Sequence, residues 1–277
     1  MPLRFSRRPG LVAYLTAGDP DLGATRDIAL AAIDNGADVI ELGVPFSDPL
    51  ADGPVIQRAS ERAVGRGVRL TDVLALCAEL RSARPDAGLV LFSYLNPVLQ
   101  FGRPDRLGFP DFCARAADAG ADGVLLTDMI VEEAAEYLDA MTRNALAPIF
   151  LAAPTSPDAR LQAIAQASLS TGKTGFVYAI SRVGITGTRD TIATDAPPLV
   201  ARLRRYTDLP IAVGFGISNA EHVRAVGEFA DAAVIGSALV SLIEQTRPAD
   251  AARAIGQFIA NLHAGATPRP AEAETNV

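Results

Sequence analysis

Two carboxylates, Glu41 and Asp52, follow one another in a stretch that brings both toward one pocket. The segment Asp38–Gly43 is largely apolar around Glu41, which predicts a buried strand carrying an acidic side chain. A loop rich in Pro, Gly and Asp follows and supplies Asp52 just before a helix expected to begin near Pro54. A carboxylate on a strand and another on the loop behind it can act as general acid and base, provided that the pocket holds their pKa values apart.

Both carboxylates also have an ordinary structural interpretation. A carboxylate inside an apolar strand is unfavourable by several kcal/mol unless it is paired, protonated or functional. Glu41 could therefore form an ion pair with an arginine of the same core, and Asp52 could belong to a turn that caps the next helix. We favour a functional role for Glu41 because active sites of parallel barrels form at the carboxyl ends of the strands.

The other reactive side chains exclude several kinds of chemistry. Lys173 is the only lysine, and it precedes an expected strand, which is the wrong end for a Schiff base. His222 and His263 are the only histidines, so neither a Cys/His metal cluster nor a serine triad is expected. Cys77 and Cys113 lie in helical patterns and are expected as buried thiols. Carboxylates, hydroxyls and backbone amides remain.

Composition points to a cytoplasmic α/β protein. The chain has 277 residues, of which 49% are hydrophobic, and its net charge is −7. An acidic chain without a basic cluster is a poor partner for nucleic acid or anionic membranes. No apolar run approaches the roughly 18–20 residues that span a bilayer. The amino terminus carries charge but no signal-peptide core, so we expect a cytoplasmic location.

Short apolar segments alternate with amphipathic helical patterns along the chain. Strands are expected at Leu11–Ala17, Asp38–Gly43, Leu89–Tyr94, Gly123–Thr127, Pro148–Ala152, Phe176–Ile180, Pro210–Gly214 and Ala232–Gly236. Nearly continuous apolar strands separated by helices indicate a parallel sheet covered by helices. This number of units predicts a single-domain (β/α)8 TIM barrel. A doubly wound open sheet is the alternative, but it usually has a Gly-rich first turn, which is absent here.

A partial internal repeat supports the barrel. The segments N-G-A-D-V-I-E-L-G, A-G-A-D-G-V-L-L-T-D and F-A-D-A-A-V-I-G-S each place Ala-Asp between the end of a helix and a strand. Because these turns precede their strands, Asp38, Asp122 and Asp231 are expected at the face that stabilises the barrel. We therefore interpret all three as structural.

Glycines at consecutive strand ends predict an anion site. Gly214 and Gly216 follow the seventh expected strand, and Gly236 with Ser237 follows the eighth before a short helix. Backbone amides in these loops commonly hold phosphate in barrels. Gly184 and Gly187 could add amides from the loop after the sixth strand.

The run E-L-G-V-P-F-S-D-P-L-A-D-G-P, preceded by T-A-G-D-P, closely resembles the α-subunit family of tryptophan synthase. The later order G-I-T-G, G-F-G-I-S and G-S-A-L-V fits the same family. The resemblance covers roughly residues 10–264, so residues 1–264 are expected to form the barrel and residues 265–277 a disordered tail. It implies cleavage of indole-3-glycerol phosphate to indole and glyceraldehyde 3-phosphate. It also implies an α2β2 complex with a β subunit that carries pyridoxal phosphate (PLP), with no cofactor on the α chain.

The resemblance also assigns site residues. Glu41 matches the general acid/base of the family, and Asp52 matches the second catalytic carboxylate. The positions that match substrate-binding residues are Tyr14, Phe92, Tyr94, Leu125, Tyr178, Thr186, Gly187, Phe215, Gly216, Gly236 and Ser237. Among these, Thr186, Gly187, Gly216, Gly236 and Ser237 match the flexible-loop threonine and the phosphate site. One departure is that the helix that plugs the barrel bottom in the family is largely missing before Gly10.

Three alternatives to a β-coupled lyase stay open. The chain could be a stand-alone lyase that releases free indole, or a non-catalytic homologue that only activates a β subunit. A phosphate-binding isomerase of a related barrel type is a more distant alternative. Activity with and without the β subunit, together with substitution of both carboxylates, separates these possibilities.

Overall fold

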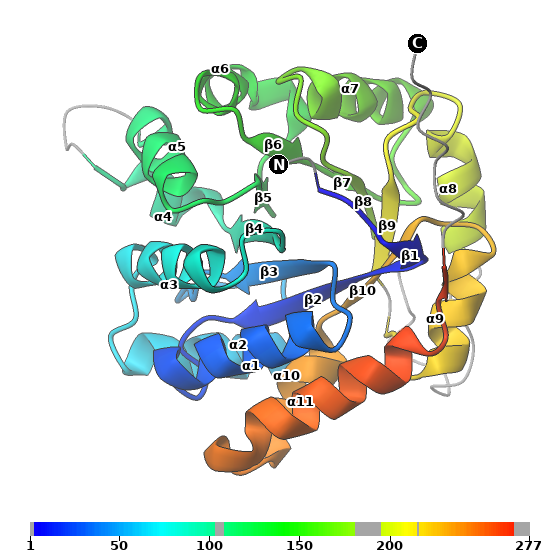
Figure 1. The fold of residues 1–277 in the computed structure, drawn as a ribbon. Coiled ribbons are helices and arrows are strands. Elements are labelled where there is room, and N and C mark those ends of the chain that lie inside the picture. Colours follow the sequence, from blue (N-terminus) through cyan, green and yellow to red (C-terminus); the bar gives the residue numbers. More distant parts are fainter. Residues whose placement is uncertain (1–2, 103–107, 181–194, 215, 269–277) are drawn as a thin grey trace.

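The computed structural model describes residues 3–102, 108–180, 195–214 and 216–268. Its main sheet is parallel and has the strand order β6-β5-β4-β3-β2-β10-β9-β8-β7 (Figure 1). The strands are β2 (Gly10–Thr16), β3 (Val39–Gly43), β4 (Gly88–Ser93), β5 (Gly123–Leu126), β6 (Ala147–Ile149), β7 (Leu151–Ala152), β8 (Val177–Ile180), β9 (Ile211–Gly214) and β10 (Ala232–Ile235).

The first and last strands of this order, β6 and β7, together occupy one strand position of the barrel. Only Phe150 separates β6, which pairs with β5, from β7, which pairs with β8. The nine strands therefore fill eight positions and close into a barrel, which confirms the predicted (β/α)8 fold. The eight expected strands are all present, with boundaries shifted by at most one residue, and the fifth is split at Phe150.

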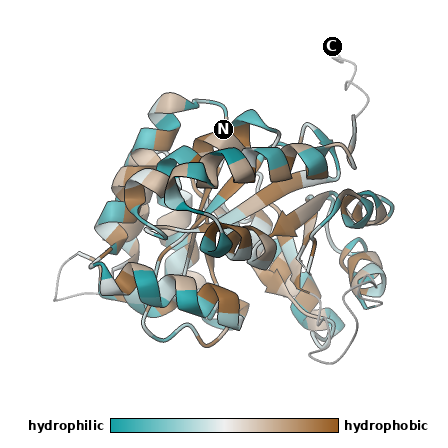
Figure 2. Ribbon diagram, turned by 90° about the horizontal axis from the view of Figure 1, so that it is seen from below, coloured by the Kyte–Doolittle hydropathy of each residue, from teal (hydrophilic) through white to brown (hydrophobic). Residues whose placement is uncertain are grey.

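Helices surround the barrel and turn their polar faces outward (Figures 1 and 2). They are α1 (Leu22–Asp34), α2 (Pro54–Gly65), α3 (Leu70–Ala83), α4 (Leu95–Leu99), α5 (Phe109–Asp118), α6 (Ala135–Arg143), α7 (Asp158–Leu169), α8 (Ala196–Leu203), α9 (Ala220–Gly227), α10 (Ser237–Gln245), α11 (Pro248–His263) and the short 3-10 helix η1 (Val131–Glu133). The start of α2 at Pro54 agrees with the sequence, and proline suits the first turn of a helix because it needs no N–H partner there.

Apolar side chains fill the lower part of the barrel interior. One buried cluster takes Val12 from β2, Val39 from β3 and their counterparts around the sheet. Leu3 and Phe5 from the amino-terminal segment join this cluster, and the Phe5 ring lies 6.0 Å from that of Phe176. Gly10 leaves the space for Phe5, since a Cβ on Gly10 would overlap the ring. Leu3 and Phe5 therefore help to close the barrel bottom.

The Ala-Asp turns of the internal repeat secure the starts of neighbouring strands. Asp38 accepts the Leu11 N–H at 2.9 Å, Asp122 accepts the Leu89 N–H at 2.9 Å, and Asp231 accepts the Ile211 N–H at 2.9 Å. The structural interpretation of the three aspartates is confirmed. Each aspartate precedes one strand and accepts a hydrogen bond from an N–H of the neighbouring strand. The three carboxylates therefore link pairs of strands at the amino-terminal end of the barrel.

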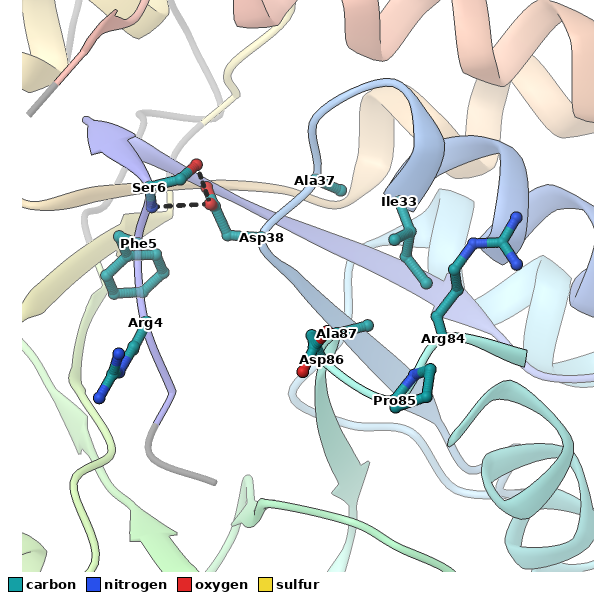
Figure 3. Close-up of a pocket in the computed structure, with 10 residues that line it drawn as sticks. All are labelled: Arg4, Phe5, Ser6, Ile33, Ala37, Asp38, Arg84, Pro85, Asp86 and Ala87. Atoms are coloured by element: carbon teal, nitrogen blue, oxygen red, sulfur yellow. Dashed lines mark hydrogen bonds between the residues drawn. The ribbon is translucent and has the colours of Figure 1, made fainter. Parts of the chain in front are cut away.

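Each of these aspartates also has a second partner from another part of the chain. Asp122 pairs with Arg81 at 2.6 Å, and Asp231 pairs with Arg204. Asp38 instead accepts hydrogen bonds from the Ser6 backbone and hydroxyl, at 2.9 and 2.6 Å. Figure 3 shows this contact at the rim of a surface pocket that also contains Phe5. The amino-terminal segment is thus held in the barrel bottom by the same type of contact.

Two short antiparallel strands join the two ends of the chain, β1 (Arg7–Arg8) and β11 (Thr267–Pro268). The sequence patterns did not indicate this pair. Gly265 and Ala266 are buried, so the first residues of the expected tail pack on the barrel. The rest of that tail lies outside the described residues, and the division into a barrel at 1–264 and a tail at 265–277 stays a prediction.

The Asp122 link gives a stability prediction. Asp122→Ala leaves the Arg81 guanidinium and the Leu89 N–H without their carboxylate, so we expect the free energy of unfolding to fall by about 3–5 kcal/mol. Asp34→Ala is the matched control, because the Asp34–Arg84 pair is largely exposed and should contribute about 0–1 kcal/mol. Urea denaturation of both variants measures the difference. Equal effects would contradict the proposed role of Asp122.

Candidate active site

Glu41 is the central residue of β3 and is fully buried. It pairs in register with Tyr14 of β2 on one side and Val90 of β4 on the other. Both of its carboxylate oxygens are buried and have no hydrogen-bond partner among the described residues. The expected alternative of an ion pair with a barrel arginine is therefore absent from the described part of the chain.

Burial alone raises the pKa of Glu41 from 4.5 to about 8. An acid with this pKa is mostly protonated at neutral pH and can both donate and recover a proton there.

Asp52 is the second carboxylate and lies in the loop between β3 and α2, partly buried. Burial raises its pKa to about 6, and a hydrogen bond from the Tyr94 hydroxyl opposes that rise. The Tyr94 oxygen lies 3.1 Å from Asp52 Oδ2, and it also accepts the Ala51 N–H at 2.9 Å. Near pH 7 Asp52 is therefore mainly ionised while Glu41 is mainly protonated.

Two tyrosines show that the carboxylates face the same space. Burial raises the pKa of the Tyr14 hydroxyl first, and the charges of Asp52 and Glu41 raise it further. The pKa of Tyr178 on β8 is likewise raised by burial and then by Glu41, Tyr14 and Asp52. Because the charges of both carboxylates act on each hydroxyl, Glu41 and Asp52 both lie near Tyr14 and Tyr178.

Two glycines make room for these tyrosines. A Cβ on Gly43 would overlap the Tyr14 hydroxyl, and a Cβ on Gly214 would overlap the Tyr178 hydroxyl. Sequence reasoning assigned no such role to Gly43 and considered Gly214 only as part of an anion site. No short-range pattern indicates that a tyrosine of the neighbouring strand approaches a strand glycine.

Apolar and aromatic residues pack around the two tyrosines. Phe92 at the end of β4 packs edge-on against Tyr14, with ring centroids 5.0 Å apart. Leu125 of β5 is fully buried and pairs in register with Phe92. The structure thus brings Tyr14, Phe92, Leu125 and Tyr178 together in the interior of the barrel.

The expected phosphate residues lie at the ends of β9 and β10. Gly216 follows β9 with a φ of +41°, a backbone conformation that favours glycine. Apart from its chain neighbours, no atom of the described residues lies within 4 Å of the place of its Cβ. Gly236 precedes α10, and Ser237 is the first residue of that helix and is exposed. Gly214 and Gly236 end neighbouring paired strands, so these amides belong to one side of the barrel mouth. Thr186, Gly187 and Phe215 lie outside the described residues.

Neither a metal cluster nor a membrane helix occurs in the described residues. No group of three or more His, Cys, Asp and Glu side chains there could hold a metal ion. No helix in the same ranges is long and apolar enough to cross a bilayer.

Comparison with known proteins identifies the family. The family model for the tryptophan synthase alpha chain matches residues 2–266. The tryptophan synthase alpha chain of Solibacter usitatus is 51% identical over 243 residues, which cover 88% of this chain and 86% of that one. That of Methylococcus capsulatus is 47% identical over 260 residues, or 93% of each chain.

Solved structures agree with the sequence relatives. A chain of the tryptophan synthase α2β2 complex of Pyrococcus furiosus superposes with a TM-score of 0.84 at 36% identity, and the match covers 94% of this chain and 100% of that one. Tryptophan synthase of Mycobacterium tuberculosis gives a TM-score of 0.82 at 34% identity, with 95% and 94% covered. The chain therefore belongs to the tryptophan synthase alpha chain family.

Proposed function

We propose that this chain cleaves indole-3-glycerol phosphate to indole and glyceraldehyde 3-phosphate, and that it passes the indole to a tryptophan synthase β subunit. Membership of the family and the similarity to chains from α2β2 complexes support this proposal. The observation that carries it is the fully buried Glu41, which has no partner among the described residues, together with the mainly ionised Asp52 in the loop after its strand.

Glu41 performs the proton transfers in the proposed reaction. Protonated Glu41 donates its proton to indole C3, and the resulting carboxylate accepts the proton of the side-chain hydroxyl next to the ring. As that hydroxyl becomes an aldehyde, the bond between indole C3 and the side chain breaks, and its electron pair restores the aromatic ring. One proton enters and one leaves, so no redox step is required.

Asp52 stabilises the charge that this proton transfer creates. Protonation at C3 makes the ring nitrogen positive, and an ionised carboxylate that accepts the indole N–H favours that state over the neutral substrate. Tyr14, Phe92, Tyr94, Leu125 and Tyr178 hold the ring between the two carboxylates.

The phosphate lies across the barrel mouth from the carboxylates in this proposal. Gly216, Gly236 and Ser237 would bind it through backbone amides and the amino end of α10. Gly187 would add a further amide, Phe215 would contact the ring, and Thr186 would help to hold Asp52. Residues 1–264 form this barrel, and residues 265–277 a tail that takes no part in the reaction.

The reaction as proposed uses no cofactor on this chain, because both proton transfers are performed by carboxylates. PLP belongs to the β subunit of the expected α2β2 assembly. We assign the reaction to the cytoplasm, since a phosphorylated substrate does not cross a membrane unaided.

Substitution of the carboxylates tests the chemistry. Glu41→Gln and Asp52→Asn should each lower the rate of indole-3-glycerol phosphate cleavage by a factor of about 10² or more, because each removes a proton-transfer or charge-stabilising group. Both variants should still activate the β subunit, measured as tryptophan formation from added indole and serine. Full cleavage activity in both variants would rule out the carboxylate mechanism, and strong wild-type cleavage without β would favour a stand-alone lyase.

The pKa values predict a bell-shaped dependence of kcat/KM on pH. Asp52 must be ionised and Glu41 protonated in the free enzyme, so activity should rise through about pH 6 and fall through about pH 8. Steady-state rates between pH 5 and 9.5 measure both limbs. A profile that stays flat across this range would show that neither carboxylate acts in the assumed protonation state.

Glu41 should also make stability depend on pH. In the unfolded chain its carboxyl ionises near pH 4.5, whereas the folded protein retains the proton up to about pH 8, so the contribution of Glu41 to stability falls as pH rises through this interval. Glu41→Gln does not titrate. We expect it to match the wild type near pH 5 and to exceed its free energy of unfolding by several kcal/mol at pH 8.5, since one pKa unit corresponds to about 1.4 kcal/mol.

Urea denaturation at pH 5, 6.5 and 8.5 measures this difference. Glu79→Gln is the matched control, because Glu79 is 60% exposed and its contact with Arg26 is 4.0 Å long. A constant difference between Glu41→Gln and the wild type at all three pH values would contradict the unpaired burial of Glu41.

A further inference from the structure

Tyr94 links two loops that are distant in the sequence. It follows β4, where it is the residue before α4, and its side chain is buried. Its ring packs against Phe46 with centroids 5.3 Å apart, and Phe46 belongs to the loop between β3 and α2. The hydroxyl therefore reaches the same loop that carries Asp52.

The hydrogen bonds of this hydroxyl fix its direction. The Ala51 N–H can only donate, so it occupies a lone pair of the Tyr94 oxygen at 2.9 Å. The hydroxyl proton is then free for the carboxylate oxygen of Asp52 at 3.1 Å. A hydroxyl bonded in this way holds one carboxylate oxygen and the amide before it in a single arrangement.

The backbone around Tyr94 is itself tied to the end of β5. The Leu95 N–H donates to Asp128 Oδ1 at 2.7 Å, and the Thr127 N–H donates to the Ser93 carbonyl at 2.9 Å. Tyr94 is thus flanked on both sides by hydrogen bonds to residues that follow β5. Such anchoring suits a side chain that orients another group.

We infer that Tyr94 is a positioning residue that acts through Asp52, holding its carboxylate toward the pocket and favouring its ionised form. This role differs from the ring contact that the family resemblance implies for Tyr94, and it rests on the proposed function. Hydrogen bonds that a carboxylate accepts stabilise its charged state, whereas a ring contact with the substrate does not.

Tyr94→Phe tests this inference, because it removes the hydroxyl and retains the ring. We expect the acid limb of kcat/KM to move upward from about pH 6 by about one pH unit, since a hydrogen bond to a charged group is lost. At pH 6 the rate should fall about fivefold more than at pH 8, and KM should change little. An unmoved acid limb would overturn the inference.

A double-mutant cycle separates the two roles of Tyr94. If Tyr94 acts through Asp52, adding Tyr94→Phe to Asp52→Asn should change the remaining rate by less than about threefold. If it acts on the substrate alone, the two effects should multiply. Tyr137→Phe is the matched control, because it also removes a buried hydroxyl, bonded at 3.1 Å to the Val124 carbonyl, and should leave both limbs in place.

Carbon-13 NMR measures the titration midpoint of the Asp52 carboxyl group directly and does not require catalytic turnover. Aspartate labelled at the carboxyl carbon is incorporated, and Asp52→Asn identifies the Asp52 signal. The midpoint should rise in Tyr94→Phe and stay unchanged in Tyr137→Phe. A wild-type chain that does not cleave indole-3-glycerol phosphate, alone or with β, defeats the proposed function, whereas an unshifted Asp52 midpoint defeats the inference.

Discussion

The unpaired burial of Glu41 is the constraint on which the site depends. A carboxyl group surrounded by β-strands and deprived of donors keeps its proton near neutral pH, and that proton is what cleavage at indole C3 requires. A single arginine within reach would lower the pKa of Glu41 and remove the acid. The barrel therefore has to seal the space below Glu41 with apolar groups, and Phe5 and Leu3 contribute to that seal from outside the strand pattern.

The two carboxylates differ in function because their surroundings differ. Glu41 lies on a strand, where neighbouring strands exclude water and every backbone donor is already used by the sheet. Asp52 lies on a loop, where it is partly exposed and accepts a hydrogen bond from Tyr94. The pKa values consequently separate to about 8 and about 6. This separation allows one acid and one anion to coexist within a single pocket.

The positions of the strands along the chain, and the placement of one carboxylate on a strand and the other on a loop, could be predicted because their sequence signals are local. Apolar runs, Ala-Asp turns and the Pro/Gly-rich loop before Pro54 each lie within a short segment. Other features depend on segments that meet only in the folded chain. They are the split of one strand at Phe150, the β1–β11 pair and the close approach of the Tyr14 hydroxyl to Gly43. The Tyr94–Asp52 bond is of the same kind, so the sequence suggested a substrate contact for Tyr94 without its partner.

The carboxylates at the two ends of the barrel differ in their hydrogen-bond partners. At the strand starts, Asp38, Asp122 and Asp231 each satisfy a backbone N–H and a second group, which secures the closed sheet. Toward the mouth, Glu41 has no donor among the residues that the structure describes. Its burial is unfavourable mainly at alkaline pH, where the carboxyl group ionises. Stability gained from the first set permits the second to persist. A barrel can combine structural carboxylates at one end with a catalytic carboxylate at the other. The same strands run through both ends, whereas the side chains and loops at each end vary independently.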